Sequence, residues 1–387
     1  MPLANSFLTY DQVKNTGEPE FPLDVFFCES CGLVQIEHII PPEDIFSDYI
    51  YFSSTSDAIH EHAAYLAKEF NRRFSMNRRS FVVEIASNDG CVLNYFRNLN
   101  AKILGVEPAK NVANVAIERG IETFIDFFDE KSAIDIKERY GQADVILARH
   151  VFAHVPEIHS FVRGLKLLLK NDGIIAIEAP YLVDMVKKTE FDTIYHEHLS
   201  YLSLRPMLKL FNKYGFELFD VEYFSIHGGS LMYFFGNASV HKIKKSVAQF
   251  LVQEINEELN DIKKYDQFAK KVFLTKTKLL SLLGSLKKEG KTIAAYGASA
   301  KGNTLLNFCR ISTGLIDYIV DKSRYKQNRF TPGTHIPVLH PERLTKDVPD
   351  YTLILAWNFA DEILEQQKFY REKGGKFIIP IPEPKVI

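Results

Sequence analysis

Side chains that transfer protons are concentrated in one short segment, residues 190–201. These twelve residues include two histidines, two tyrosines and several acids, and they follow an expected strand. Two further histidines, His154 and His227, stand in other loops. Several neutral imidazoles suit a reaction in which a carbon acid is deprotonated. We therefore expect this segment to carry the chemistry.

The run His196-Glu197-His198 within that segment also has a metal-binding interpretation, because imidazole and carboxylate are good ligands for zinc or iron. Side chains at i and i+2 share a face only on a strand, and no third ligand has a matching spacing. A buried polar network that holds the loop is the plain structural alternative. Proton transfer is the interpretation we favour.

A second chemical pattern is a tight turn between a strand and a helix. Glu84 lies inside the strand, and the small polar loop that follows ends at Gly90. Ala86 and Asn88 occupy positions where glycines would admit a pyrophosphate, which disfavours a dinucleotide. Glu107 follows Gly90 by 17 residues and ends the next strand, where a carboxylate accepts hydrogen bonds from ribose hydroxyls.

This combination favours S-adenosylmethionine over NAD, since that cofactor has a ribose and an adenine but no phosphate. Asp126, Arg149 and His150 end later strands and are expected at the same crevice. The alternative is that Glu84 and Glu107 are surface acids of an ordinary α/β domain.

The elements that position these residues form three parts, 1–75, 76–240 and 241–387. The first is loop-rich and ends in an amphipathic helix, and the third begins with connecting helices. Alternating strand and helix patterns predict a doubly wound parallel sheet in each of the other two parts. The expected strands of the central part are 81–86, 101–106, 121–125, 144–148, 173–178, 216–221 and 231–235, seven in one sheet. The expected strands of the last part are 292–296, 316–320, 351–356 and 376–380.

Length and composition agree with a multidomain globular protein. At about 150 residues per domain, 387 residues suggest two or three domains. A formal charge of −2 provides no basic field for nucleic acid or an anionic membrane. Four cysteines are too few for a disulfide-stapled module, and no apolar run resembles a signal peptide or a membrane span. We expect a cytoplasmic monomer or weak oligomer.

Read in order, several motifs resemble a known family, the three-domain C-methyltransferases that methylate carbon 3 of nucleotide-linked 4-keto-6-deoxy sugars. The resemblance runs from residue 2 to near the C-terminus. The motifs that carry it are Leu3-Ala4-Asn5, Cys28 with Cys31, 49–54 (YIYFSS), 85–90 (IASNDG), 190–198 (EFDTIYHEH), 227–230 (HGGS), 296–303 (YGASAKGN) and Trp357-Asn358.

The resemblance implies a zinc-binding N-terminal domain, a central class I (Rossmann-like) methyltransferase domain that binds S-adenosylmethionine, and a C-terminal α/β domain for the nucleotide-sugar. It implies that His198 is the base, that Tyr195 binds or polarises the keto group, and that Glu197 orients His198. His227 is a second candidate for stabilising the enolate. Further substrate contacts implied by the resemblance are Tyr49, Tyr51, His154, Lys301, Asn303, Lys326, Trp357 and Asn358.

Two departures from the family pattern stand out. The family's zinc site has two Cys-x-x-Cys pairs, whereas this chain has only Cys28 and Cys31 in that region. A structural zinc normally needs four ligands, so the chain either lacks a preceding segment of its relatives or folds this domain without full zinc coordination. His150 stands where relatives usually have asparagine, which affects a detail of the cofactor pocket.

The leading hypothesis is methyl transfer from S-adenosylmethionine to carbon 3 of a dTDP- or GDP-linked 4-keto-6-deoxyhexose. O-methylation of a sugar or small molecule is the nearest alternative. An NAD-dependent nucleotide-sugar oxidoreductase would use the 296–303 turn, although its glycine spacing is wrong. A non-catalytic binding protein is a third alternative, which the retained 195–198 cluster disfavours.

Overall fold

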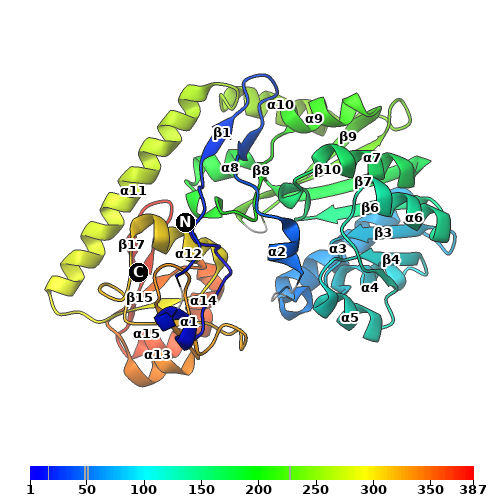
Figure 1. Cartoon of the computed structure of the whole chain (residues 1–387). Coiled ribbons are helices and arrows are strands. Elements are labelled where there is room, and N and C mark those ends of the chain that lie inside the picture. The colour runs from blue at the N-terminus through cyan, green and yellow to red at the C-terminus, as the bar shows by residue number, and fades with distance from the viewer. Residues whose placement is uncertain (16, 48, 50–51, 226–227) are drawn as a thin grey trace.

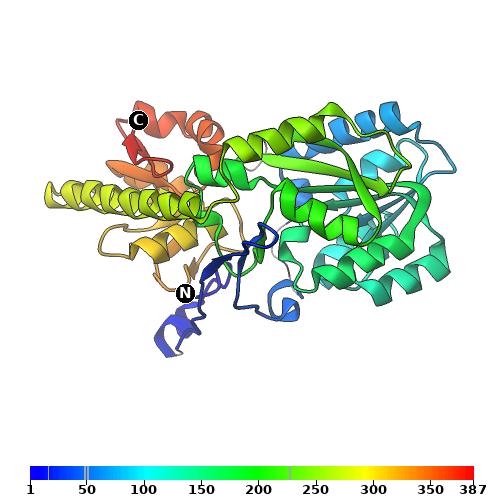
Figure 2. The same ribbon diagram turned by 90° about the horizontal axis from the view of Figure 1, so that it is seen from above.

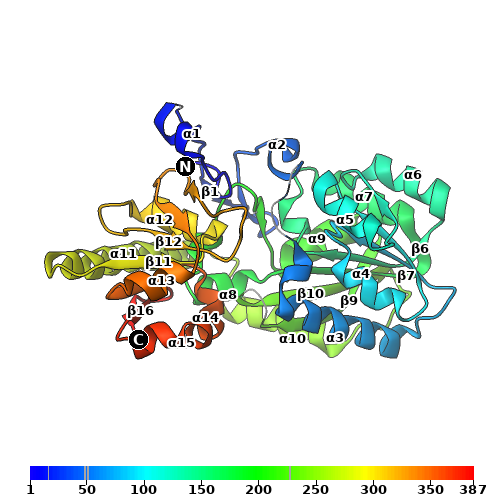
Figure 3. The same cartoon turned by 90° about the horizontal axis from the view of Figure 1, so that it is seen from below.

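The computed structural model describes residues 1–15, 17–47, 49, 52–225 and 228–387. Two of the expected site residues, Tyr51 and His227, lie outside the described residues. Figure 1 shows a central domain and a C-terminal domain side by side, with the long helix α11 (Ile262–Lys288) running along the C-terminal domain. In Figures 2 and 3 the N-terminal segment, in blue, runs from one side of the C-terminal domain to the junction between the two domains.

The central domain is built on a seven-stranded sheet with the order β5-β4-β3-β6-β7-β10-β9. Strands β3 to β7 are parallel, and β10 is antiparallel to both β7 and β9. This confirms the expected seven strands and the class I methyltransferase arrangement. The strands are β3 (Phe81–Ile85), β4 (Lys102–Val106), β5 (Thr123–Phe124), β6 (Ala143–Arg149), β7 (Leu169–Pro180), β9 (Phe216–Phe224) and β10 (Ser230–Asn237).

Helices cover both faces of this sheet because its strands are apolar on both sides. Val82 and Val145 face the layer that contains α3 and α4, whereas Val83 and Ile146 face the opposite layer. The helices of this domain are α3 (Asp57–Phe74), α4 (Cys91–Arg97), α5 (Lys110–Glu118), α6 (Glu130–Tyr140), α7 (Ile158–Leu168), α8 (Leu182–Lys187) and α9 (Leu204–Lys213), with short helical turns η1 (Ser53–Thr55), η2 (Phe152–His154) and η3 (Phe191–Thr193).

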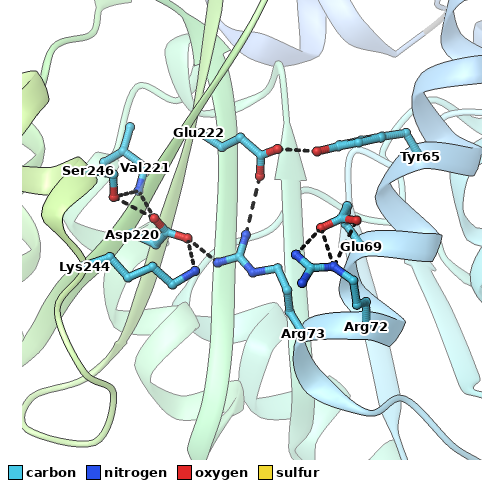
Figure 4. Close-up of polar contacts among 9 residues, drawn as sticks. All are labelled: Tyr65, Glu69, Arg72, Arg73, Asp220, Val221, Glu222, Lys244 and Ser246. Carbon is cyan, nitrogen blue, oxygen red and sulfur yellow. Dashed lines mark hydrogen bonds and ion pairs between the residues drawn. The ribbon is translucent and has the colours of Figure 1, made fainter.

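Helix α3 is fixed to the sheet by an ion-pair network as well as by its apolar stripe. The Arg73 guanidinium pairs with Asp220 and lies 3.4 Å from the Glu222 carboxylate (Figure 4). Lys244 adds a second cation 2.7 Å from Asp220, and the Tyr65 hydroxyl donates to Glu222. These contacts fix the C-terminal part of helix α3 to β9.

The N-terminal segment contacts both larger domains. Strands β1 (Val25–Phe27) and β2 (Val34–Ile36) form a hairpin, which β8 (Ser200–Tyr201) of the central domain extends to three strands. Before the hairpin, Leu8 forms an isolated bridge with Phe330 of the C-terminal domain. Two short helices complete this segment, α1 (Tyr10–Asn15) and α2 (Pro42–Phe46).

The C-terminal domain is a second seven-stranded sheet, with the order β13-β14-β12-β11-β15-β16-β17. Its five inner strands are parallel, which confirms the expected doubly wound domain. The strands are β11 (Ile293–Tyr296), β12 (Ile319–Val320), β13 (Arg329–Phe330), β14 (Pro337–Leu339), β15 (Tyr351–Ile354), β16 (Lys376–Ile379) and β17 (Lys385–Val386). Its helices are α12 (Ala300–Cys309), α13 (Glu342–Asp347), α14 (Ala360–Gln366) and α15 (Lys368–Glu372), with the turn η5 (Trp357–Phe359).

Two helices connect the domains, α10 (Lys245–Asn256) and α11. Helix α11 spans roughly 40 Å and buries one stripe that includes Val272, Leu279 and Leu283. Among the described residues, no helix combines the length and apolar character needed to cross a bilayer.

Candidate active site

The turn after β3 has an unusual backbone that shapes a crevice at the sheet edge. Ala86, Asn88 and Gly90 all have φ in the left-handed region, at 54°, 52° and 73°. At Gly90 this φ favours glycine, and a Cβ atom would lie 2.4 Å from Ile121 Cδ1, which would have to shift. The turn therefore brings backbone groups close to the carboxyl ends of β3 and β4, where a parallel sheet binds its ligand.

Glu107 closes the other side of this crevice, just after β4. Its two carboxylate oxygens accept hydrogen bonds from the backbone amides of Asn88 and Ala109, both at 2.9 Å. Burial nevertheless raises the pKa of Glu107. Each carboxylate oxygen can accept a further bond, so the side chain remains able to hold two hydroxyl groups of a ligand.

A buried charge cluster lies at the ends of β3, β6 and β7. Arg149 donates from Nε to Glu178 at 2.8 Å, and His62 of α3 lies 3.0 Å from the same oxygen. His150 is 3.6 Å from Glu178. Burial raises the pKa of Glu84 to about 8, although the nearby Arg149 cation opposes this. Arg149 is therefore paired with Glu178 and also lies close enough to Glu84 to lower its pKa. We expect all these residues at one crevice.

Asp126 lies two residues beyond β5 and is exposed. Its carboxylate accepts the backbone N–H of Phe127 at 2.8 Å. Its role toward a cofactor stays a prediction.

Within residues 190–201, called the catalytic segment below for the role expected of it, the contacts of His198 fix its tautomer. Its Nδ1 lies 2.7 Å from the Thr193 carbonyl oxygen, which can only accept a hydrogen bond. Nδ1 therefore carries the proton, and Nε2 has the lone pair. The Tyr195 hydroxyl lies 3.1 Å from Nε2 and donates to it. His154 stacks edge-on against His198, with ring centroids 4.9 Å apart.

Burial sets the protonation of this cluster. It lowers the pKa of His198 well below 6.5, and the neighbouring His154 lowers it further. It also lowers the pKa of His154 to about 4. In contrast, burial raises the pKa of Tyr195 well above 10. At neutral pH the segment therefore offers neutral imidazoles as acceptors and a phenol that keeps its proton as a donor.

Glu197 is bonded to the N-terminal segment, because its Oε1 accepts from the Asn5 side-chain amide at 2.6 Å. Its expected role in orienting His198 stays a prediction. A cavity of about 170 Å³ lies beside Glu197 and is also lined by Asn5, Tyr49 and His196.

The C-terminal domain meets the catalytic segment through two expected residues. The Trp357 indole donates to Asp192 at 2.6 Å. The Lys301 ammonium lies 5.2 Å from the centre of the Trp357 ring. It is buried without a hydrogen-bond partner among the described residues. The Lys301 charge lowers the pKa of Glu190, although burial raises that pKa to about 7 overall.

Other expected substrate residues hold the protein's own backbone in this structure. Asn303 is fully buried and donates to the Ala4 carbonyl at 2.7 Å. Lys326 donates to the Ala298 carbonyl at 2.8 Å. Asn358 lies half-buried beside Trp357. The structure therefore brings Lys301 and Trp357 to the catalytic segment and leaves the substrate roles of the other three as predictions.

Comparison with known proteins identifies the family. Residues 225–382 match a family described as "C-methyltransferase C-terminal domain", and residues 59–221 match "Methyltransferase domain". Residues 1–46 match "Putative zinc binding domain". The C-methyltransferase NovU of Streptomyces niveus is 38% identical over 387 residues, which is all of this chain and 92% of that protein. The chain belongs to the C-methyltransferase family.

Solved structures resemble part of this C-methyltransferase. A SAM-dependent methyltransferase from Anabaena variabilis is 13% identical over 52% of the chain and 100% of its own, with a TM-score of 0.38. The magnesium protoporphyrin IX methyltransferase ChlM from Synechocystis is 11% identical over 46% of the chain and 83% of its own, with a TM-score of 0.37. At these values the likeness adds nothing to the family assignment.

The C-methyltransferase uses S-adenosylmethionine, and the crevice fits that cofactor. Buried polar atoms without a hydrogen-bond partner among the described residues surround the turn, namely Glu84 Oε2 and Ser87 Oγ. Such atoms are normally satisfied, so they indicate a polar ligand. Glu107 would hold the ribose hydroxyls, and the 86–90 turn would approach the rest of the cofactor.

The N-terminal part of the C-methyltransferase does not present a complete zinc site. Cys28 and Cys31 are free thiols in the turn of the β1–β2 hairpin. Among the described residues, no group of three or more His, Cys, Asp or Glu side chains is placed to hold a metal ion. Two thiols are half of what a structural zinc requires. These residues alone therefore do not fit the ion.

Sequence reasoning missed the residues that bind the parts of the chain together at the site. Asn5 and Asp192 occur in motifs of the family pattern, but no role follows from their spacing. His62 lies in helix α3 and Glu178 in strand β7. The apolar patterns of these elements predict the helix and the strand but not a contact between the two side chains. An acid inside a strand, as at Glu178, is the one signal that was available.

Proposed function

We propose that this C-methyltransferase transfers a methyl group to carbon 3 of a nucleotide-linked 4-keto-6-deoxyhexose. The observation that carries the proposal is the pairing of a neutral imidazole acceptor with a protonated phenol, His198 Nε2 with the Tyr195 hydroxyl at 3.1 Å. A hydrogen on the carbon next to a ketone is removed by such a base when a donor stabilises the resulting enolate oxygen.

In the proposed reaction, the Tyr195 hydroxyl turns from His198 to the keto oxygen at carbon 4. This frees the lone pair on Nε2, which removes the proton from carbon 3. The electron pair of that C–H bond enters the enolate, and the phenol donates a hydrogen bond to the developing oxyanion. The Thr193 carbonyl holds the Nδ1 proton of His198 and so stabilises the imidazolium that forms.

When bound, S-adenosylmethionine would supply the methyl group: carbon 3 of the enolate would form the new C–CH3 bond as the S–CH3 bond breaks, and that electron pair would stay on sulfur as a neutral thioether. Glu107 would hold the cofactor from the end of β4, where its carboxylate also accepts from the Asn88 amide, and the buried ion pairs of Glu178 lie at the end of neighbouring strands. His154 contributes a neutral ring beside His198, which adds no positive charge to repel a sulfonium.

The nucleotide part of the proposed substrate is assigned to the C-terminal domain. The Lys301 ammonium is a buried cation at the start of α12, and the Trp357 ring offers an aromatic face. A diphosphate needs cations, and a base stacks on aromatic rings. These features support a dTDP- or GDP-linked sugar without favouring either.

The test is incubation of the protein with S-adenosylmethionine and a dTDP- or GDP-linked 4-keto-6-deoxyhexose. Mass spectrometry should show a gain of one methyl group, and a substrate deuterated at carbon 3 should lose its label. A methylated product that keeps the deuterium would instead show O-methylation. The absence of a methylated product with both nucleotides would refute the substrate assignment.

The role of His198 is tested by its replacement with glutamine. We expect His198→Gln to lower turnover by at least about 100-fold, which is within the range for a general base, while cofactor affinity stays within about twofold. His159→Gln is a matched control, because His159 Nδ1 also lies 2.8 Å from a tyrosine hydroxyl, that of Tyr214, but on the exposed face of α7. Undiminished turnover of His198→Gln would exclude it as the base.

A further inference from the structure

The N-terminal segment links the C-terminal domain to the catalytic segment through two adjacent residues. Asn303 of α12 donates to the Ala4 carbonyl at 2.7 Å. The next residue, Asn5, donates from its side-chain amide to Glu197 Oε1 at 2.6 Å. Two hydrogen bonds therefore connect the C-terminal domain, the N-terminal segment and the catalytic segment.

We propose that Asn5 is a positioning residue, whose side-chain amide fixes the carboxylate of Glu197 at the edge of the catalytic segment. The proposal rests on the function proposed above. Of the two polar atoms of an Asn side chain, only the amide nitrogen can donate to a carboxylate, so the contact also fixes the orientation of Asn5. The Asn303 bond to Ala4 holds the backbone from which Asn5 projects.

The hydrogen bond from Asn5 affects the ionisation of Glu197. The residue is 6% exposed, and burial raises the pKa of its carboxyl to about 7. The Asn5 amide and the Lys326 charge oppose that rise. Lys326 acts at longer range, because its ammonium donates to the Ala298 carbonyl. Asn5 therefore supplies the direct hydrogen bond that favours the ionised form of Glu197.

Other titratable groups face Glu197 from every side. His154 on η2 contacts the backbone of Glu197, and burial together with the charge of Glu197 raises the pKa of Tyr195 on the same segment. Asp44 of α2, Tyr49 and His196 line the cavity beside it. His154 and Tyr195 are uncharged at neutral pH because of their shifted pKa values. Burial raises the pKa of Glu197 itself to about 7.

The consequence is a pH dependence that Asn5 controls. A lost donor to the carboxylate disfavours the ionised form, so the pKa of Glu197 rises and less of it is ionised at a given pH. A hydrogen bond to a charged group corresponds to about one pH unit or more. The titration of Glu197 should therefore move upward by about one pH unit in Asn5→Ala.

The experiment compares the full-length wild-type protein with Asn5→Ala, and with Asn77→Ala as control. Asn77 also donates its side-chain amide to a carbonyl, that of Ser75 at 3.1 Å, but in an exposed loop. Carbon-13 NMR of labelled glutamate, assigned with Glu197→Gln, gives the pKa of Glu197 directly. We expect a rise of about one pH unit in Asn5→Ala and none in Asn77→Ala.

The two measurements separate this proposal from the proposed function. Should no candidate substrate be methylated, the function is wrong, and the NMR titration still decides the role of Asn5. A Glu197 titration that is unchanged in Asn5→Ala would overturn the positioning role, whatever the activity. If Asn5→Ala does not fold, Asn5→Asp replaces it, because it keeps the shape, removes the donor and should raise the pKa of Glu197 further.

Discussion

The hydrogen bond between Trp357 and Asp192 should be a principal tie between the two larger domains. It joins η5 of the C-terminal domain to the catalytic segment at 2.6 Å, and Asp192 is completely buried. Trp357 is the single tryptophan of the chain. Trp357→Phe keeps an aromatic ring and removes the N–H, whereas Asp192→Asn keeps an acceptor oxygen and removes the charge.

The size of the effect follows from the type of bond. A hydrogen bond to a charged group contributes about 1.5–3 kcal/mol, so we expect Trp357→Phe to lower the free energy of unfolding by about 2 kcal/mol. For domains of this size that corresponds to a fall in Tm of roughly 4–8 °C. Asp192 keeps Lys301 as a nearby cation, which limits the loss.

The assay is urea denaturation followed by circular dichroism for the wild type, both single variants and the double variant. A double-mutant cycle should give a coupling energy of about 1 kcal/mol or more between Trp357 and Asp192. Glu383→Gln is the control, because it removes an exposed ion pair with Lys278 and should change stability by less than about 0.5 kcal/mol. A coupling energy within the additivity error, about 0.5 kcal/mol or less, would refute the idea that this bond ties the domains.

Two further predictions concern the cofactor crevice and the histidine cluster. Glu107→Ala should weaken S-adenosylmethionine binding by roughly 10–100-fold, since hydrogen bonds from ribose hydroxyls to a carboxylate are lost, and calorimetric binding within twofold of the wild type would contradict this. His154 has a pKa of about 4, below its ordinary value of 6.5, so the unfolded chain binds more protons between these values and stability is lost as the pH falls through them. Acidification from pH 7 to pH 5 should therefore cost about 2 kcal/mol through His154, and the pH sensitivity of urea unfolding should shrink by that amount in His154→Gln; equal sensitivities would disprove it.

Local patterns in the sequence predicted most of the fold because the strands are regular. Alternating and continuous apolar runs located β3 to β10 of the central sheet to within a few residues. In the C-terminal domain, β13, β14 and β17 were not predicted, since strands of two or three residues carry no period. Strand β5 is only Thr123–Phe124, shorter than the expected 121–125, for the same reason.

The site was harder to predict because its contacts join distant parts of the chain. Asn5 and Glu197 are 192 positions apart, and Trp357 and Asp192 are 165 apart. Hydrophobic periodicity does not predict contacts over such distances in the chain. In contrast, Glu84, Gly90 and Glu107 lie within one βαβ unit, so their spacing alone predicts that they share a crevice. The sequence alone does not show which side chain Glu197 contacts, and the structure shows that it accepts a hydrogen bond from Asn5.

For the proposed reaction, burial has two opposing effects on the catalytic segment. It keeps His198 unprotonated at neutral pH by lowering its pKa, but the same change makes the imidazole a weaker base toward a C–H bond. The lower basicity of His198 must be offset by hydrogen bonds to the keto oxygen of the substrate, where the negative charge develops. There, burial acts in the useful direction, because it raises the pKa of Tyr195 and keeps the phenol protonated as a donor. A segment enclosed by three parts of the chain therefore prepares the base and the donor together, which an exposed loop would not do.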